Sequence, residues 1–440
     1  MSEHKHKKIG PFLATMMVAS TMIGSGIFLL PASLGAVGSI SILSWLAATG
    51  GAVLIAGVFC WLTLADPHAK GLFSYIRDAF GPSTGFVIGA LYWASCIVAC
   101  VAIALAVTGY LSVFVPAVAK PPFSNLATVA IIWLLVAANI LGPRFVAGMQ
   151  SWSLVLGLLP VLLAAIGGWF FFHADTFLAS WNVTGGSTIA VVPRATVTAF
   201  WAFLGVESAI VLSTRVRNPG RDIAIGTLGG IGIAALIYIA ASAALMGMLP
   251  AAALAKSAAP FADAFAPVLG AGVAGAVALC AMLKASGTLG SSMLLTVETA
   301  ECESVLGHMR VAAALREAPR ASTTNLIFTG ALCSIVAVGS ASPTLTRQFT
   351  LVTNVAVVLS VLIYGSASLA VLRLSAKLPK AKRMWARATA VAAALFSLAL
   401  GASSEPLVLA WTGGTVLTTL LLYLSARFYR AQRATGAAGA

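Results

Sequence analysis

The chain has 440 residues, of which 60% are hydrophobic and only 9% are charged, and its formal net charge is +14. Because an average globular domain is about one quarter charged and disorder requires low hydrophobicity, this composition excludes both a soluble domain and a disordered chain. A polytopic membrane protein remains. The basic residues lie in short segments between apolar stretches, which is typical of membrane orientation signals, so we expect no nucleic-acid partner.

Twelve apolar stretches follow one another along the chain, each long enough to cross a bilayer as a helix. The loops between them leave no room for a soluble domain, and the longest, 299–323, is expected to be an amphipathic segment. We therefore expect one all-α membrane domain over residues 1–440. The predicted spans are 12–34, 38–65, 82–113, 123–142, 150–172, 189–214, 223–249, 265–298, 324–340, 346–374, 384–401 and 406–427.

The charges of the loops predict how these helices are oriented. If the N-terminus is cytoplasmic, 21 of the 26 Lys and Arg residues fall on the cytoplasmic side, four fall outside, and Lys284 lies within a span. Lys and Arg are enriched in cytoplasmic loops. Both termini are therefore expected to be cytoplasmic.

Two predicted spans are interrupted by small residues. The first contains Gly24 and Gly26, and the sixth contains Gly205 followed by Glu207. Glycines alone are as typical of a helix-packing face as of a helix break. Broken backbone at membrane depth is tolerated where it lines a cavity or is buried in protein. The matching positions and the adjacent acid favour a cavity.

The interrupted spans are five spans apart, which is typical of an inverted repeat with one broken helix in each half. We therefore predict a first repeat over residues 12–172, a second over 189–374, and two additional helices over 384–427. The expected cavity belongs to the two broken helices.

The residues at these breaks resemble the amino acid–polyamine–organocation superfamily, and within it the basic amino acid/polyamine antiporters of the arginine/agmatine and putrescine/ornithine kinds. Spans one to eight align almost without gaps, and spans nine to twelve match in length and pattern. The glycine motif is common to the superfamily, whereas Trp201 with residues 205–208 is more specific to the subgroup. The matching stretches are residues 24–31, 41–45, 91–93, 181–183, 201–209 and 246–250.

This resemblance implies a transporter that exchanges an extracellular basic amino acid for an intracellular amine or amino acid by alternating access. It also implies a bacterial inner membrane, contact with lipid, a small-molecule substrate, the ability to form a homodimer and no cofactor. A proton-coupled symporter, or an exchanger of a different and even neutral amino acid, remains the alternative.

Free backbone N–H groups and the positive dipole end at the start of a half-helix suit a carboxylate. The resemblance accordingly implies that Ser25 and Gly26 hold the substrate carboxylate. It also implies that backbone carbonyls hold the substrate amino group and that a flat aromatic ring covers the aliphatic part. These further residues are Met22 and Ile23 in the first span and Trp201 and Leu204 in the sixth.

Glu207 is the clearest acidic residue within a predicted span. An ionisable residue there is costly and is a functional hypothesis by default, although a buried structural hydrogen bond is the alternative. The resemblance implies that Glu207 forms an inner gate with Tyr92 and Tyr364. It also implies that Phe349 contributes an aromatic lid on the outer side.

Three positions depart from the arginine/agmatine group. Ser292 stands where that group has a tryptophan that stacks on the guanidinium, so a cation–π contact of roughly 0.5–2 kcal/mol is missing. Cys100 replaces a polar asparagine near the substrate, and Cys96 and Ser95 lie on or beside its helix face. Ala356 replaces a small hydroxyl residue. These changes argue against a simple transfer of arginine/agmatine specificity.

Lys284 lies in the middle of the eighth span, where an ammonium must pair, lose its proton or reach water. We hypothesise that it occupies the position of the sodium ion in sodium-coupled relatives, beside the first span. A pair with Glu207 is the rival hypothesis. A charged Lys284 near the pocket would disfavour dicationic substrates.

Other classes of function fit less well. All five His residues lie at or beyond the ends of predicted spans, and no His–Ser pair or pair of acids occurs within one, which argues against an intramembrane enzyme. No Cys-x-x-Cys or Cys/His spacing indicates a metal site. A channel would need a polar lining, and polar residues are scarce within the spans.

Overall fold

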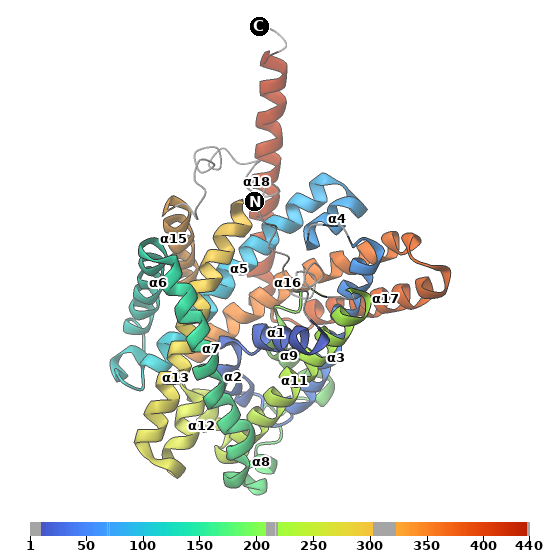
Figure 1. The fold of residues 1–440 in the computed structure, drawn as a ribbon. Coiled ribbons are helices and arrows are strands. Elements are labelled where there is room, and N and C mark those ends of the chain that lie inside the picture. Colours follow the sequence, from blue (N-terminus) through green and yellow to red (C-terminus); the bar gives the residue numbers. More distant parts are fainter. Residues whose placement is uncertain are drawn as a thin grey trace, which may run out of the picture.

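The computed structural model describes residues 10–67, 69, 71–207, 216, 219–301 and 323–437. Within these residues the fold is a bundle of helices without strands, and α18 extends beyond the rest of the bundle (Figure 1). We call the end of the bundle that carries α4 the α4 face, and the opposite end, with α8 and α12, the α8 face (Figure 1). The predicted all-α polytopic fold class is confirmed.

The first half of the chain contains the elements of the first five predicted spans and the short helices between them. They are α1 (Pro11–Met22), η1 (Ser25–Phe28), α2 (Leu30–Gly35), α3 (Ser41–Ala65), α4 (Leu72–Phe80), α5 (Pro82–Leu111), η2 (Pro116–Ala119), α6 (Phe123–Leu141), α7 (Pro143–Ile166), η3 (Gly167–Phe171) and α8 (Ala174–Ala179).

The second half begins with the sixth span and ends with the projecting C-terminal helix. Its elements are α9 (Thr188–Phe200), η4 (Trp201–Phe203), α11 (Pro219–Met248), α12 (Ala251–Lys256), α13 (Pro260–Glu301), α15 (Thr323–Gly339), α16 (Leu345–Leu374), η5 (Ser375–Lys377), α17 (Lys380–Ala402) and α18 (Pro406–Ala437).

Over its described residues each predicted span coincides with a helix or a bent helix pair, and residues 208–214 of the sixth span lie outside the described part. Nine helices of the described residues are long and apolar enough to cross a membrane, and the pair Pro11–Met22 and Gly26–Gly35, bent by 51°, is a tenth candidate. The shorter apolar helices Thr188–Phe203 and Thr323–Gly339 occupy the positions of spans six and nine. The division into two inverted repeats stays a prediction, and most of the predicted amphipathic loop, 302–322, lies outside the described residues.

The structure contains local features that hydropathy did not predict. The short helices α4, α8 and α12 lie between spans, and α13 begins before its predicted start, at Pro260. The longer α13 contains a kink at Gly270, where φ is +83°, a left-handed value that favours glycine.

Both predicted interruptions are real breaks in helical geometry. In the first, α1 ends at Met22 and Gly24 is extended, with φ −99° and ψ −155°, before η1 begins. In the second, η4 ends at Phe203, Leu204 is extended with ψ 142°, and Gly205 has φ +100°. Because left-handed backbone is costly for residues with a Cβ, Gly205 is required by its conformation.

Small residues let neighbouring helices approach each other closely. The first broken span packs on α11, where a Cβ at Gly230 would lie 2.7 Å from the Val18 side chain. Likewise, α3 packs on α17, where a Cβ at Gly51 would overlap the Phe396 ring. Close packing through small residues is the usual basis of helix association in membranes.

Replacing Gly51 with Ala is expected to lower the stability of the protein in detergent by about 1–3 kcal/mol, because the added methyl group overfills the contact with Phe396. Gly50→Ala is the matched control, since nothing lies within 4 Å of a Cβ at that position. Thermal unfolding followed by size-exclusion chromatography measures both variants. Equal stability of the two variants would contradict this close contact between α3 and α17.

Candidate functional site

A cavity of about 380 Å³ lies where the two helix breaks meet. Its wall is formed by the breaks in the first and sixth spans together with α5, α13 and Ser360 of α16. Nine of the residues predicted for the substrate site and the gate lie on this wall. They are Met22, Gly26, Tyr92, Ser95, Cys96, Trp201, Leu204, Glu207 and Ser292.

The other predicted residues do not lie on the wall of this cavity. Cys100 is fully buried behind it, with its sulfur 3.6 Å from the hydroxyl of Thr296, which does line the cavity. Cys100 thus lies one layer behind the wall, and its expected role at the substrate stays a prediction. The remaining residues off the wall are Ile23, Phe349, Ala356, Tyr364 and Lys284, all buried.

Ser25 is a separate case. Its backbone lies in η1, at the start of the second half of the first broken span. Its side chain lies outside the described part of the structure, and the role expected for this residue stays a prediction.

Trp201 covers the break in the first span. A Cβ at Gly26 would lie 2.8 Å from Nε1 of Trp201, so the ring rests directly on the glycine backbone. The ring of Phe349 meets Trp201 edge to face, with the centroids 6.5 Å apart. The indole N–H is buried and has no acceptor among the described residues, so it is a free donor beside the cavity. The two rings form an aromatic cover on the α8 side of the cavity.

The carboxylate of Glu207 is held by three donors. Its Oε2 atom accepts hydrogen bonds from the Tyr364 hydroxyl, at 2.6 Å, and from the Gly205 N–H, at 3.1 Å. Its Oε1 atom accepts a longer bond, 3.4 Å, from the Tyr92 hydroxyl. The three predicted gate residues therefore meet, and their bonds join α5 and α16 to the sixth span. Among the described residues Glu207 makes no ion pair with Lys284, contrary to the rival hypothesis.

Tyr238 of α11 connects the two breaks and is a residue that the sequence analysis missed. Its hydroxyl donates to the carbonyl of Met22 at 2.5 Å and lies 3.4 Å from the carbonyl of Ala202. The Met22 carbonyl also accepts from the Gly24 N–H at 2.6 Å. This carbonyl, expected to hold the substrate amino group, already has two partners.

Two further aromatic residues hold Tyr238 in place. The Trp45 ring lies 5.4 Å from the Tyr238 ring, and the Phe203 ring lies 5.8 Å from it. A tyrosine in a long apolar helix carries no local signal of this role. Its neighbour Trp45 belongs to one of the stretches that carry the resemblance, so the sequence did indicate that this region of the bundle matters.

Small hydroxyl residues of α13 form one side of the cavity. Thr288, Ser292 and Thr296 follow one another at four-residue intervals, so they share a helix face. Thr288 and Thr296 donate to the carbonyls one turn earlier, at 3.0 and 2.7 Å. Ser292 therefore leaves space and a hydroxyl where the resemblance predicts a stacking ring.

Lys284 lies on α13 one turn before Thr288, away from the cavity wall. Its side chain is 2% exposed, and its aliphatic stem occupies the space over Gly157 of α7, where a Cβ would overlap it. No described residue makes a hydrogen bond or an ion pair with its ammonium group. The structure thus contains a buried amine whose polar end is unpaired within the described chain.

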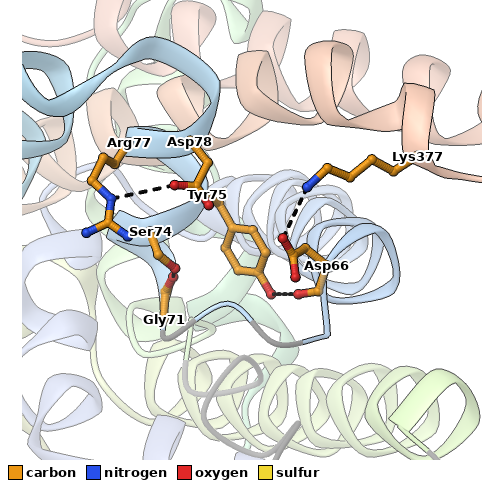
Figure 2. A network of polar contacts seen from close by, with 7 residues as sticks. All are labelled: Asp66, Gly71, Ser74, Tyr75, Arg77, Asp78 and Lys377. Carbon is orange, nitrogen blue, oxygen red and sulfur yellow. Dashed lines mark hydrogen bonds and ion pairs between the residues drawn. The ribbon is translucent and has the colours of Figure 1, made fainter.

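A network of polar contacts holds α4 and its loop against the bundle (Figure 2). Lys377 of η5 pairs with Asp66 at 3.1 Å, and the Tyr75 hydroxyl donates to the Asp66 carbonyl at 3.0 Å. Burial raises the pKa of Tyr75, so the hydroxyl keeps the proton that this bond needs. The loop after α3 is thereby joined to α4 and to the end of α16.

The same helix α4 touches Tyr92, one of the three predicted gate residues. The ring of Phe73 packs on Tyr92 with centroids 5.2 Å apart. At the other end of α4, the Arg373 guanidinium donates to the Ala79 carbonyl at 2.6 Å and lies over the Phe80 ring. A cation at a helix C-terminus is favourable. The helix α4 therefore packs on Tyr92 and is anchored to α16.

Tyr238→Phe is expected to destabilise the protein by about 1–3 kcal/mol, because the buried carbonyls of Met22 and Ala202 lose the tyrosine hydroxyl as a donor while the ring is kept. Tyr423→Phe is the matched control, since it removes an exposed hydroxyl bond to Ser83. Thermal unfolding in detergent compares the two variants. A Tyr238→Phe protein with unchanged stability would show that this hydroxyl does not hold the breaks together.

Comparison with known proteins identifies similar chains. Residues 9–424 match the family described as amino acid permease. The cadaverine/lysine antiporter of Escherichia coli (strain K12) is 37% identical over 289 residues, which are 66% of this chain and 65% of that protein, so the match spans just under two thirds of its length. The putrescine transporter PotE of the same strain is 31% identical over 423 residues, 96% of each chain. The PotE protein of Haemophilus influenzae is 30% identical over 370 residues, 84% of this chain and 85% of that protein.

Proposed function

Because the chain belongs to the amino acid permease family, we propose that it exchanges an external basic amino acid for an internal diamine by alternating access. The predicted resemblance to the amino acid–polyamine–organocation superfamily and its basic amino acid/polyamine antiporters is confirmed, and these proteins are transporters and not enzymes. The relatives named for lysine, cadaverine and putrescine support a linear amine as the substrate class.

The observation that carries this proposal is the charge distribution in the cavity. Glu207 is the one charged side chain on the wall among the described residues, and it lies at the helix break. A carboxylate in an apolar cavity attracts an ammonium group, which is then stabilised by a charge-assisted hydrogen bond. The volume of about 380 Å³ falls within the range of small-molecule sites.

The bonds around Glu207 support a mechanism for opening the gate. The ammonium of a substrate side chain would compete with the long 3.4 Å bond from Tyr92 for the carboxylate. Releasing Tyr92 would also loosen its contact with Phe73 of α4. Opening toward the α4 face would follow, while Trp201 and Phe349 keep the other side covered. We place the α4 face in the cytoplasm of a bacterial inner membrane, as the loop charges predict.

Ser292 favours a flexible linear amine over a guanidinium. The hydroxyl wall of α13 offers no aromatic face for stacking, so the cation–π contact expected in arginine/agmatine exchangers has no partner there. We therefore assign lysine-like amino acids and their decarboxylated diamines as the substrate pair. A homodimer, implied by the resemblance, stays a prediction.

Uptake into liposomes reconstituted with the purified protein tests the exchange. Labelled lysine is expected to enter vesicles loaded with cadaverine, putrescine or lysine and not to enter empty vesicles. Uptake into empty vesicles driven by an imposed proton gradient would instead support a symporter. A panel of neutral amino acids under the same gradient tests that alternative directly.

Glu207→Gln is expected to reduce lysine–cadaverine exchange by about tenfold or more, because an amide cannot supply the charge that attracts the ammonium group. Glu298→Gln is the matched control, since Glu298 is exposed on α13 and does not line the cavity. Initial exchange rates at equal protein per vesicle measure the effect. Wild-type rates in the Glu207→Gln protein would contradict the assignment.

Lys284 is the candidate for coupling transport to a proton. Its unpaired ammonium in a helix that packs on η1 supports the hypothesis that it replaces a co-transported cation beside the first span. Lys284→Ala is therefore expected to slow exchange and to flatten the dependence of its initial rate on pH, because the variant lacks the buried amine that would bind and release the proton. Unchanged transport and an unchanged pH profile would reject the hypothesis.

A further inference from the structure

A second and larger cavity, of about 660 Å³, opens at the α8 face of the bundle. Its wall is formed by α2, α9, the first turns of α16 and the loop before α18. It shares no lining residue with the cavity at the helix breaks. Neither the family nor the names of the relatives assign a role to it.

Three elements line the two cavities in succession. The first broken span contributes Gly26 to the inner cavity and Ser33 to the outer one. The sixth span contributes Trp201 to the inner cavity and Thr198 to the outer one. On α16, Ser360 lines the inner cavity, and Asn354, Thr350 and Arg347 line the outer one. The outer cavity therefore lies on the path that leads from the α8 face to the aromatic cover.

The outer cavity contains three charged side chains. Arg194 comes from α9, Arg347 from α16, and Glu405 from the loop before α18. All three are exposed, and none makes a side-chain hydrogen bond or ion pair with a described residue. Two unpaired guanidiniums and one unpaired carboxylate around one cavity are complementary to a molecule that carries both a carboxylate and an ammonium group.

A buried polar group in the same cavity also lacks a partner. Asn354 is 7% exposed, and its Oδ1 atom accepts no hydrogen bond from the described residues. Buried polar atoms are nearly always satisfied, so an unpaired one beside a cavity indicates a place for water or a ligand donor. One helical turn before Asn354, the Thr350 hydroxyl donates to the Ser33 hydroxyl at 2.8 Å. This bond joins α16 to α2 at the wall of the same cavity.

We propose that the outer cavity is a selective access subsite for the carboxylate of an α-amino acid, held by Arg194 and Arg347. Guanidinium groups bind carboxylates through parallel hydrogen bonds, and Glu405 provides the complementary charge for the α-ammonium group. A diamine has no carboxylate and carries two positive charges, so the two guanidiniums repel it.

The subsite rests on the proposed exchange, and it would explain why the amino acid enters and the diamine leaves at the α8 face. On the α8 face an amino acid has to bind and a diamine has to leave. A subsite that attracts carboxylates and repels dications raises the local concentration of the first and lowers rebinding of the second. Selection between the two substrates thus begins before either reaches Glu207.

Uptake of external substrates into intact cells that make the protein tests the subsite, because cells present one face only. The double variant Arg194→Gln with Arg347→Gln is expected to raise the KM for external lysine about three- to tenfold with an unchanged maximal rate. The KM for external cadaverine is expected to stay equal or to fall. A double Arg→Lys variant keeps the charge but loses the paired hydrogen bonds, so it is expected to lie between the wild-type and Arg→Gln proteins in its KM for lysine.

The matched control removes two positive charges from the same face outside the cavity, with Lys120→Gln and Lys256→Gln. If both double variants change the lysine KM equally, general surface charge explains the effect and the subsite is overturned. An unchanged ratio of lysine KM to cadaverine KM in the arginine variant overturns it as well. If the wild-type protein exchanges neither substrate, the proposed function fails, and the same variants compared on the amino acid that it does carry still decide the subsite.

Discussion

Two interrupted helices in a low-dielectric interior are the constraint on which the rest of this structure depends. Backbone groups released by a helix break cannot be hydrated in the membrane core, so the protein has to supply partners for them. Tyr238 donates to Met22 and lies near the Ala202 carbonyl, and Glu207 accepts from Gly205. The groups that stabilise the breaks are thus the groups that surround the cavity.

The same constraint explains why the cavity has so little charge. Each ionised group at membrane depth is costly, and the one carboxylate on the wall among the described residues accepts hydrogen bonds from three donors. Tyr92 and Tyr364 supply two of these donors. Because these two tyrosines belong to α5 and α16, the hydrogen bonds to the Glu207 carboxylate depend on the positions of both helices.

Contacts at the α4 face extend this coupling to the surface. The rings of Phe73 and Tyr92 touch, and Arg373 on the helix that carries Tyr364 caps the far end of α4. The pair between Asp66 and Lys377 is partly exposed, and pairs of this kind contribute little by themselves. This pair lies beside α4 (Figure 2), and together with the Arg373 contact at Ala79 it fixes the position of α4 on the bundle.

The sequence by itself determined the long apolar helices, both breaks and the isolated acid Glu207, because hydropathy, glycine placement and a lone intramembrane acid are local signals. The resemblance added Tyr92 and Tyr364 as partners of this acid and the roles expected for all three residues. Only the tertiary structure decided which residues reach the cavity wall. In the structure Cys100 and Ala356 lie behind the wall, and the Met22 carbonyl accepts a hydrogen bond from Tyr238. The Lys284 side chain packs over Gly157, and its amine has no partner among the described residues. The tertiary structure also brought Arg194, Arg347 and Glu405 to one cavity. These outcomes depend on which helices are neighbours and how each is rotated, and a sequence of nearly uniform apolar spans carries little information on either.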